Sequence, residues 1–212
     1  VAIAGIPLDI GTTNRAGTRD GPAAIRRASR MLVDGAHPTT RVDPAALSLA
    51  DIGDFAIALG DIPGSLALIE QQAAGFDHLV ALGGEHGITL PLLRALTRRL
   101  GGPVAVVHFD AHCDTWPESF GQRFSHGQPF RLAIEEVLFD PRRMIQIGIR
   151  SPCDAETEAW LAAVRRAVEA LMQAGATDAA SGDGGTQPVL RSLGRIGAML
   201  GAMLADARRG EG

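Results

Sequence analysis

The sequence contains no tyrosine, only two cysteines, and few aromatic residues, which make up 4% of its 212 positions. The two cysteines form no CxxC pair and build no disulfide framework, so we expect a cytoplasmic protein. No apolar run reaches the roughly 18 residues that a transmembrane helix needs. The net charge of −4 provides no basic excess, which disfavours nucleic acids and anionic membranes as partners.

The remaining composition is that of a globular protein, with 46% hydrophobic and 21% charged residues. A chain of this length is sufficient for one sizeable α/β domain with its own core. Residues 1–7 have the pattern of a buried strand that begins without a methionine or a lead-in. We therefore expect that processing or truncation has removed something before it.

Apolar runs alternate with helical patterns over the first 150 residues. Strands are expected at 1–7, 47–52, 78–82, 103–109 and 144–149, and helices at 23–32, 62–74, 90–100 and 131–138. This alternation is typical of α/β proteins in which helices cover both faces of a mostly parallel sheet.

The composition changes after residue 150. Residues 155–174 and 189–209 have helical patterns rich in alanine and leucine, and 175–188 resembles a loop. We therefore expect an α/β core over 1–150 and an atypical helical C-terminal segment, 151–212, of the same domain.

Four residues with metal-ligand character follow expected strands: His86, Asp110, His112 and Asp114. Alternate side chains of extended backbone point the same way, so those of Asp110-x-His112-x-Asp114 can converge. The carboxyl ends of parallel strands are also where α/β sheets bind ligands. Carboxylates and imidazoles without thiolate suit Mn²⁺, Fe²⁺, Co²⁺ or Zn²⁺. The alternative for this spacing alone is a solvated loop after a strand.

Other histidines of the apolar runs and loops, and Cys113, are expected to have structural roles. His78 and His108 lie in apolar runs and are expected in the core or behind a ligand, whereas His37 is expected at the surface. Cys113 is expected to point away from its neighbours and to pack. No GxGxxG, GxxxxGK[ST] or GxSxG motif is present, which disfavours dinucleotide binding, P-loop chemistry and a serine nucleophile.

Three segments resemble the ureohydrolase family of arginases, agmatinases, guanidinobutyrases and formiminoglutamases: 83–86 (GGEH), 108–114 (HFDAHCD) and 125–130 (SHGQPF). The segments 5–9 (GIPLD) and 15–26 (RAGTRDGPAAIR) resemble the agmatinase branch of that family. The resemblance covers about residues 1 to 150, with the motifs in the family's order.

The resemblance implies a three-layer α/β/α fold and two Mn²⁺ ions per chain that hydrolyse a guanidino group to urea and an amine. His86 and Asp114 would hold one metal, His112 the other, and Asp110 would bridge both. His126 matches the histidine that passes a proton to the leaving amine, a role that suits imidazole.

Two departures from the family pattern are visible. Glu85 stands where the family usually has Asp, and Gly87 where it usually has Ser. The family's late acidic motif, whose first two aspartates complete both metal sites, has no match here. Asp183 is the nearest candidate, and without that motif the second metal is expected to bind weakly.

Two hypotheses for the function of the chain therefore remain. The chain is either a manganese-dependent hydrolase of a guanidino compound, or a truncated or degenerate relative without turnover that retains at most one metal. An agmatine-like substrate is preferred to arginine because Thr115-Trp116-Pro117 follows Asp114 without the asparagine of arginases. The resemblance also implies a homo-oligomer, a trimer or a hexamer.

Overall fold

A computed structural model describes residues 1–32 and 35–179 of the chain. These residues form two compact units. The N-terminal unit contains 1–99 and 118–129, and the C-terminal unit contains 100–117 and the described residues from 130 onward. The expected helix at 189–209 and Asp183 lie outside the described residues.

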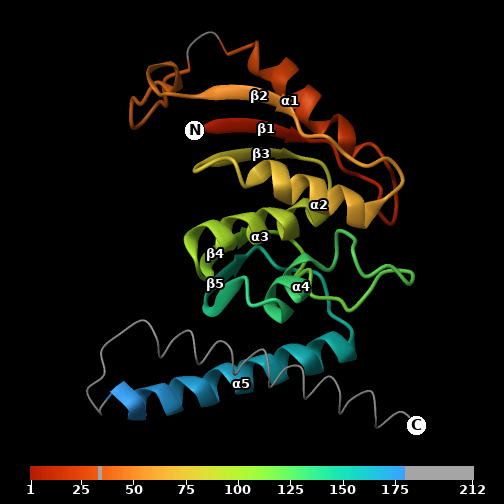
Figure 1. The fold of residues 1–212 in the computed structure, drawn as a ribbon, viewed down its shortest axis with the longest axis vertical. Helices are drawn as coiled ribbons and strands as arrows, with labels where there is room; N and C mark the ends of the chain where they lie inside the picture. Colours follow the sequence, from red (N-terminus) through yellow and green to blue (C-terminus); the bar gives the residue numbers. More distant parts are fainter. Residues whose placement is uncertain (33–34, 180–212) are drawn as a thin grey trace. The chain divides into compact units, whose positions relative to one another are not determined.

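The N-terminal unit is built on a three-stranded parallel sheet in the order β2-β1-β3. β1 (Ala2–Ile6) lies between β2 (Ala50–Asp54) and β3 (Leu79–Gly83), as Figure 1 shows. The central strand is the most buried, with Ala4 and Ile6 fully buried. It was expected to be a buried strand, because it is a short apolar run that ends at a proline.

A helix follows each strand of this sheet, because parallel strands are joined by crossover connections. These helices are α1 (Gly21–Ser29), α2 (Ile62–Ala73) and α3 (Thr89–Leu100), with short 3₁₀ turns η1 (Thr18–Asp20), η2 (Pro44–Ala46) and η3 (His86–Ile88). α2 begins at an N-cap, Asp61, whose carboxylate accepts from the backbone N–H of Gly64 at 2.9 Å. Its residues Leu66 and Ile69 are buried in the core.

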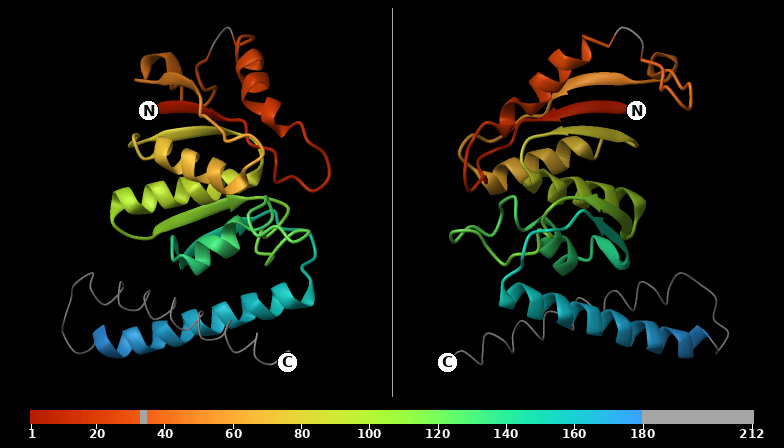
Figure 2. Two further views of the ribbon diagram at one scale, coloured as in Figure 1. Left: turned by 45° about the vertical axis from the view of Figure 1, so that its right-hand side comes forward. Right: turned by 180° about the vertical axis from the view of Figure 1, so that it is seen from behind.

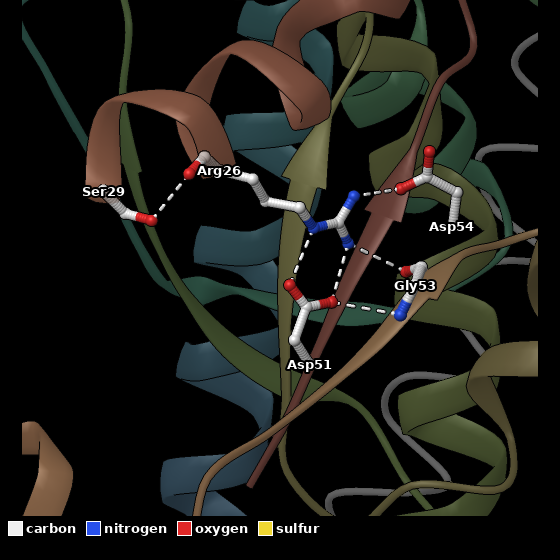
Figure 3. Close-up of polar contacts among 5 residues, drawn as sticks. All are labelled: Arg26, Ser29, Asp51, Gly53 and Asp54. Carbon is white, nitrogen blue, oxygen red and sulfur yellow. Dashed lines mark hydrogen bonds and ion pairs between the residues drawn. The ribbon is translucent and has the colours of Figure 1, made fainter. Parts of the chain in front are cut away.

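An arginine of α1 fastens that helix to β2 (Figure 3). The guanidinium of Arg26 binds both carboxylate oxygens of Asp51, with Nε at 2.7 Å and Nη2 at 2.8 Å, and it also contacts Asp54. Nη2 donates as well to the carbonyl of Gly53 at 3.0 Å. A planar fork that meets a carboxylate at two points fixes orientation as well as distance.

The C-terminal unit contains a parallel pair, β4 (Val104–Phe109) and β5 (Phe139–Ile147). The unit also contains α4 (Pro129–Glu135), which begins at the boundary between the units, and α5 (Ala155–Ala179), the long helix of Figure 2. Its core is aromatic, since the ring of Phe130 lies 4.3 Å from that of His108 and 6.0 Å from that of Phe139, centroid to centroid. The guanidinium of Arg131 lies 4.3 Å above the ring of Trp160 of α5.

The expected α/β class with parallel strands is confirmed, and several boundaries differ. β2 begins three residues later than expected, at Ala50, and β5 begins five residues earlier, at Phe139. A loop was expected to begin at Gly175, but α5 continues through Ala179. Alanine, the strongest helix former, recurs there and outweighs the single glycine. No described helix combines the length and apolarity needed to span a membrane.

Candidate metal centre and proton-transfer site

Three side chains of the C-terminal unit gather where β4 ends. A nitrogen of His108 and an oxygen each of Asp110 and Asp114 lie within 4.8 Å of one another. His108 and Asp110 lie on the same face of extended backbone, two residues apart. Asp114 reaches the same place because the chain turns sharply there, with φ of +51° at this residue. The side chains of His108 and Asp114 are buried.

A chain of hydrogen bonds fixes the ring of His108. The amide nitrogen of Gln146 on β5 donates to the carbonyl of Cys113 at 3.1 Å and to Nδ1 of His108 at 3.0 Å. A ring nitrogen that accepts carries no proton, so the proton of neutral His108 lies on Nε2. This nitrogen faces Oδ2 of Asp110 at 3.4 Å. His108 therefore lies beside the carboxylate of Asp110, the position in which partners of metal ligands typically lie.

His112 lies on the other side of the same carboxylate. Its backbone N–H donates to Oδ1 of Asp110 at 2.9 Å, and its ring Nδ1 lies 3.3 Å from that oxygen. The side chain is 56% exposed, unlike those of His108 and Asp114. Asp110 thus has an imidazole beside each of its carboxylate oxygens.

His86 and His126 belong to the N-terminal unit. His86 is the first residue of η3, directly after the loop that ends β3. Nδ1 of His126 lies 2.9 Å from the carbonyl oxygen of Gly11, and Nε2 lies 3.5 Å from the hydroxyl of Thr13. A carbonyl can only accept, so Nδ1 carries the proton. In the neutral ring, Nε2 is then free of a proton and can take one.

The loop that carries Gly11 and Thr13 is anchored by Asp9. The buried carboxylate of Asp9 accepts from the backbone N–H of Gly17 at 2.9 Å and pairs with the guanidinium of Arg19 at 2.7 Å. The hydrogen bond from Arg19 is the main reason that the pKa of Asp9 is lowered, against the opposing effect of burial.

A buried carboxylate, that of Glu85, lies beside this loop. Its side chain is 4% exposed, and a Cβ atom on Gly11 would lie 2.7 Å from its Oε1. Burial raises the pKa of Glu85 to about 7, although the positive charge of a protonated His126 would lower it. The sequence marks Glu85 only as a departure from the family pattern, and local patterns do not reveal its burial.

Comparison with known proteins identifies the family of this chain. A model of the arginase family matches residues 1–177. The chain belongs to the arginase family. Its motifs fit the agmatinase branch, and its parallel-sheet α/β fold is that of the family, as the resemblance implied.

Named relatives are similar over most of this chain. A guanidinobutyrase of Pseudomonas aeruginosa is 42% identical over 157 residues, which cover 71% of this chain and 48% of the relative. An agmatinase of Chromobacterium violaceum is 40% identical over 71% of this chain and 48% of its own. A crystal structure of Trypanosoma cruzi formiminoglutamase with Mn²⁺ has a TM-score of 0.66 and 28% identity, over 75% of this chain and 56% of that one. The chain spans about half the length of the curated relatives it matches.

Proposed function

We propose that this chain supplies metal ligands and a proton-transfer histidine to a manganese-dependent hydrolase that converts a guanidino compound to urea and an amine. The observation that carries the proposal is the group of His108, Asp110 and Asp114 where β4 ends. Two carboxylates, one of them with a histidine beside it, are a donor set that divalent metals use.

The proposed ligands follow the family motif position by position. By this correspondence, His86, Asp110, His112 and Asp114 would hold the metal, with His86 and Asp114 serving one ion, His112 a second, and Asp110 shared between them. The donor set fits Mn²⁺, because carboxylates and imidazoles are present and the neighbouring thiol of Cys113 faces Cys153. Bound metal of this kind lowers the pKa of a coordinated water and so supplies a nucleophile at neutral pH.

In this proposal, the residues of the chain bind and orient the substrate and move its proton. His126 holds a proton on Nδ1 against Gly11 and exchanges one at Nε2, the atom that would serve the leaving amine. The side chain of Trp116, partly exposed, offers an apolar face for the aliphatic part of the substrate.

We propose a small guanidino compound of the agmatine type as the substrate, with guanidinobutyrate next. The named relatives include an agmatinase and a guanidinobutyrase, which supports this class. A homo-oligomer, trimeric or hexameric, and a cytoplasmic location belong to the same proposal.

The second candidate is a relative without turnover that binds at most one metal. It is favoured by the lack of a match to the family's late acidic motif, since Asp183, its nearest candidate, is followed by two glycines. Fewer carboxylates leave more of the charge of two divalent ions uncompensated, which weakens the second site first.

The deciding measurement is the amount of manganese per chain after loading and exhaustive desalting, followed by a urea-release assay with agmatine and guanidinobutyrate. Two ions per chain together with urea release support the hydrolase, with Asp110→Asn losing both bound metal and urea release and His126→Ala losing urea release while keeping the metal. One ion or none, without urea release, supports the second candidate. His78→Ala is the matched control, because this exposed histidine lies at the start of β3 and outside the proposed site.

A further inference from the structure

The only two cysteines of the chain face each other. Sγ of Cys113 lies 3.0 Å from Sγ of Cys153, although the two residues are 40 positions apart. Both are free thiols in the structure, Cys113 buried and Cys153 partly exposed. Cys113 lies between His112 and Asp114, two of the proposed metal ligands, and Cys153 lies two residues before α5.

Backbone hydrogen bonds hold the two segments together without a covalent bond. The N–H groups of Arg150 and Ser151 both donate to the carbonyl of Ala111, at 2.9 and 3.0 Å. The hydroxyl of Thr115 donates to Sγ of Cys113 at 3.2 Å, and the amide of Gln146 binds the carbonyl of Cys113. The sulfurs therefore stay close because the surrounding chain places them there.

We propose that Cys113 and Cys153 form a reversible disulfide by exchange with a small disulfide such as oxidised glutathione, and that this cross-link weakens the adjacent metal site. One protein S–S bond forms and the S–S bond of oxidised glutathione breaks. The two protein thiols are oxidised, and their hydrogens end on two molecules of reduced glutathione. No other reactant is needed.

The exposure of the two sulfurs sets the order of the exchange. Cys153, the more accessible thiol, reacts first to give a mixed disulfide with glutathione, and Cys113 then displaces the glutathione. Burial, with a smaller effect from the hydrogen bond to Cys113, raises the pKa of Cys153 to about 12. Exchange at neutral pH is therefore slow, and the test has to be run to equilibrium.

The effect on the metal site follows from position and rests on the proposed function. A disulfide bond is about 2.05 Å long, so the sulfurs must approach by about 1 Å. Because Cys113 lies between His112 and Asp114, and Cys153 is held near it by the hydrogen bonds of Arg150 and Ser151 to Ala111, part of this movement falls on the backbone of the two proposed ligands. Displacements of this size are enough to degrade a metal site.

The cross-link is tested by equilibrating the full chain with a series of ratios of reduced to oxidised glutathione, folded and in urea. Acid quenching, alkylation and intact-mass spectrometry then count the free thiols. We expect the folded chain to form the intrachain disulfide at more reducing ratios than the unfolded chain. A folded chain that remains dithiol, carries only glutathione adducts, or is no more oxidised than the unfolded chain overturns the proposal. Cys153→Ser is the control that cannot cross-link.

The effect on the metal is tested by manganese titration of the oxidised and the reduced chain. We expect binding about tenfold weaker after oxidation, restored by a phosphine reductant, and no change in the Cys113→Ser/Cys153→Ser double variant. Equal affinity of both forms overturns the effect on the metal site. A reduced chain that binds no manganese contradicts the proposed function instead, while the mass measurement still decides whether the cross-link forms.

Discussion

Glu85 and Gly87 fit each other sterically. A Cβ atom on Gly87 would lie 2.7 Å from Oε1 of Glu85 and 3.6 Å from the carbonyl oxygen of Ser125. Gly11 leaves room for the same carboxylate, since a Cβ atom there would also lie 2.7 Å from Oε1 of Glu85. The side chain of Glu85, longer than that of aspartate, therefore occupies the space that a side chain at position 87 would fill. The two positions at which the sequence departs from the family pattern are coupled.

The coupling predicts a non-additive pair of substitutions. Gly87→Ala forces the buried carboxylate to move and should destabilise the chain by about 1 kcal/mol. Shortening the acid, as in Glu85→Asp, removes the atoms in the way, so the double variant should be more stable than the sum of the two single effects indicates. Urea unfolding of the wild type and the three variants measures this. Strict additivity would show that the two positions do not interact.

The raised pKa of Glu85 predicts a specific pH dependence of stability. The folded chain binds this proton more tightly than the unfolded chain, whose value is 4.5. The contribution of Glu85 to the free energy of unfolding is therefore most favourable below pH 4.5 and is lost as the pH rises to about 7. If the whole pKa shift is converted to free energy, it corresponds to about 3 kcal/mol of stability. Residual contact of the carboxyl group with solvent lowers the expected loss of stability to about 1–2 kcal/mol.

Glu85→Gln removes this titration while keeping the shape of the side chain. Measured in metal-free buffer, the variant should gain stability over the wild type progressively from pH 4.5 to 7 and stay level above. Glu118→Gln, at an exposed position, should show no such trend. A constant difference between Glu85→Gln and the wild type across this range would contradict the assignment.

The sequence predicted the parallel strands and the polar group after β4. His108 is buried beside Asp110, which agrees with its expected place in the core or behind a ligand. The same expectation is wrong for His78, which is exposed because it precedes β3 at the end of a loop. The alternation of side chains along extended backbone was expected to continue to Asp114, and it fails because the backbone leaves the extended conformation, with positive φ at that residue. The contact of Cys113 with Cys153 depends on how β4 and α5 are placed, which no local pattern encodes.

The contact between His126 and Gly11 predicts which ring nitrogen carries the proton. Because Nδ1 donates to a carbonyl, neutral His126 should be the Nδ1–H tautomer. Long-range ¹H–¹⁵N spectra of ring-labelled protein at alkaline pH distinguish the two tautomers, with His126→Ala identifying the signal. His78, an exposed histidine, provides the comparison. An Nε2–H signal for His126 would remove the basis for proton exchange at Nε2.

The bidentate contact of Arg26 with Asp51 predicts that lysine cannot replace this arginine (Figure 3). Lysine keeps the charge but presents one ammonium where the fork makes several directed contacts. Arg26→Lys should lower the melting temperature by a few degrees, whereas Arg27→Lys, at an exposed neighbouring position, should leave it unchanged. Equal melting temperatures for both variants would show that charge alone accounts for the contact.

The start of α5 depends on Asp154. Its carboxylate accepts from the backbone N–H of Thr157 at 2.7 Å, which satisfies one of the helix's unpaired donors. The same hydrogen bond is the main cause of the lowered pKa of Asp154. The stabilisation is therefore present above the pKa of the unfolded chain and is lost as the pH falls through the lower folded value. Asp154→Ala should cost about 1 kcal/mol at neutral pH, and Asp154→Ser should recover most of it because serine also caps. Because Cys153 directly precedes this cap, the alanine variant should also form less of the proposed disulfide at a given glutathione ratio, which the same mass measurement reports.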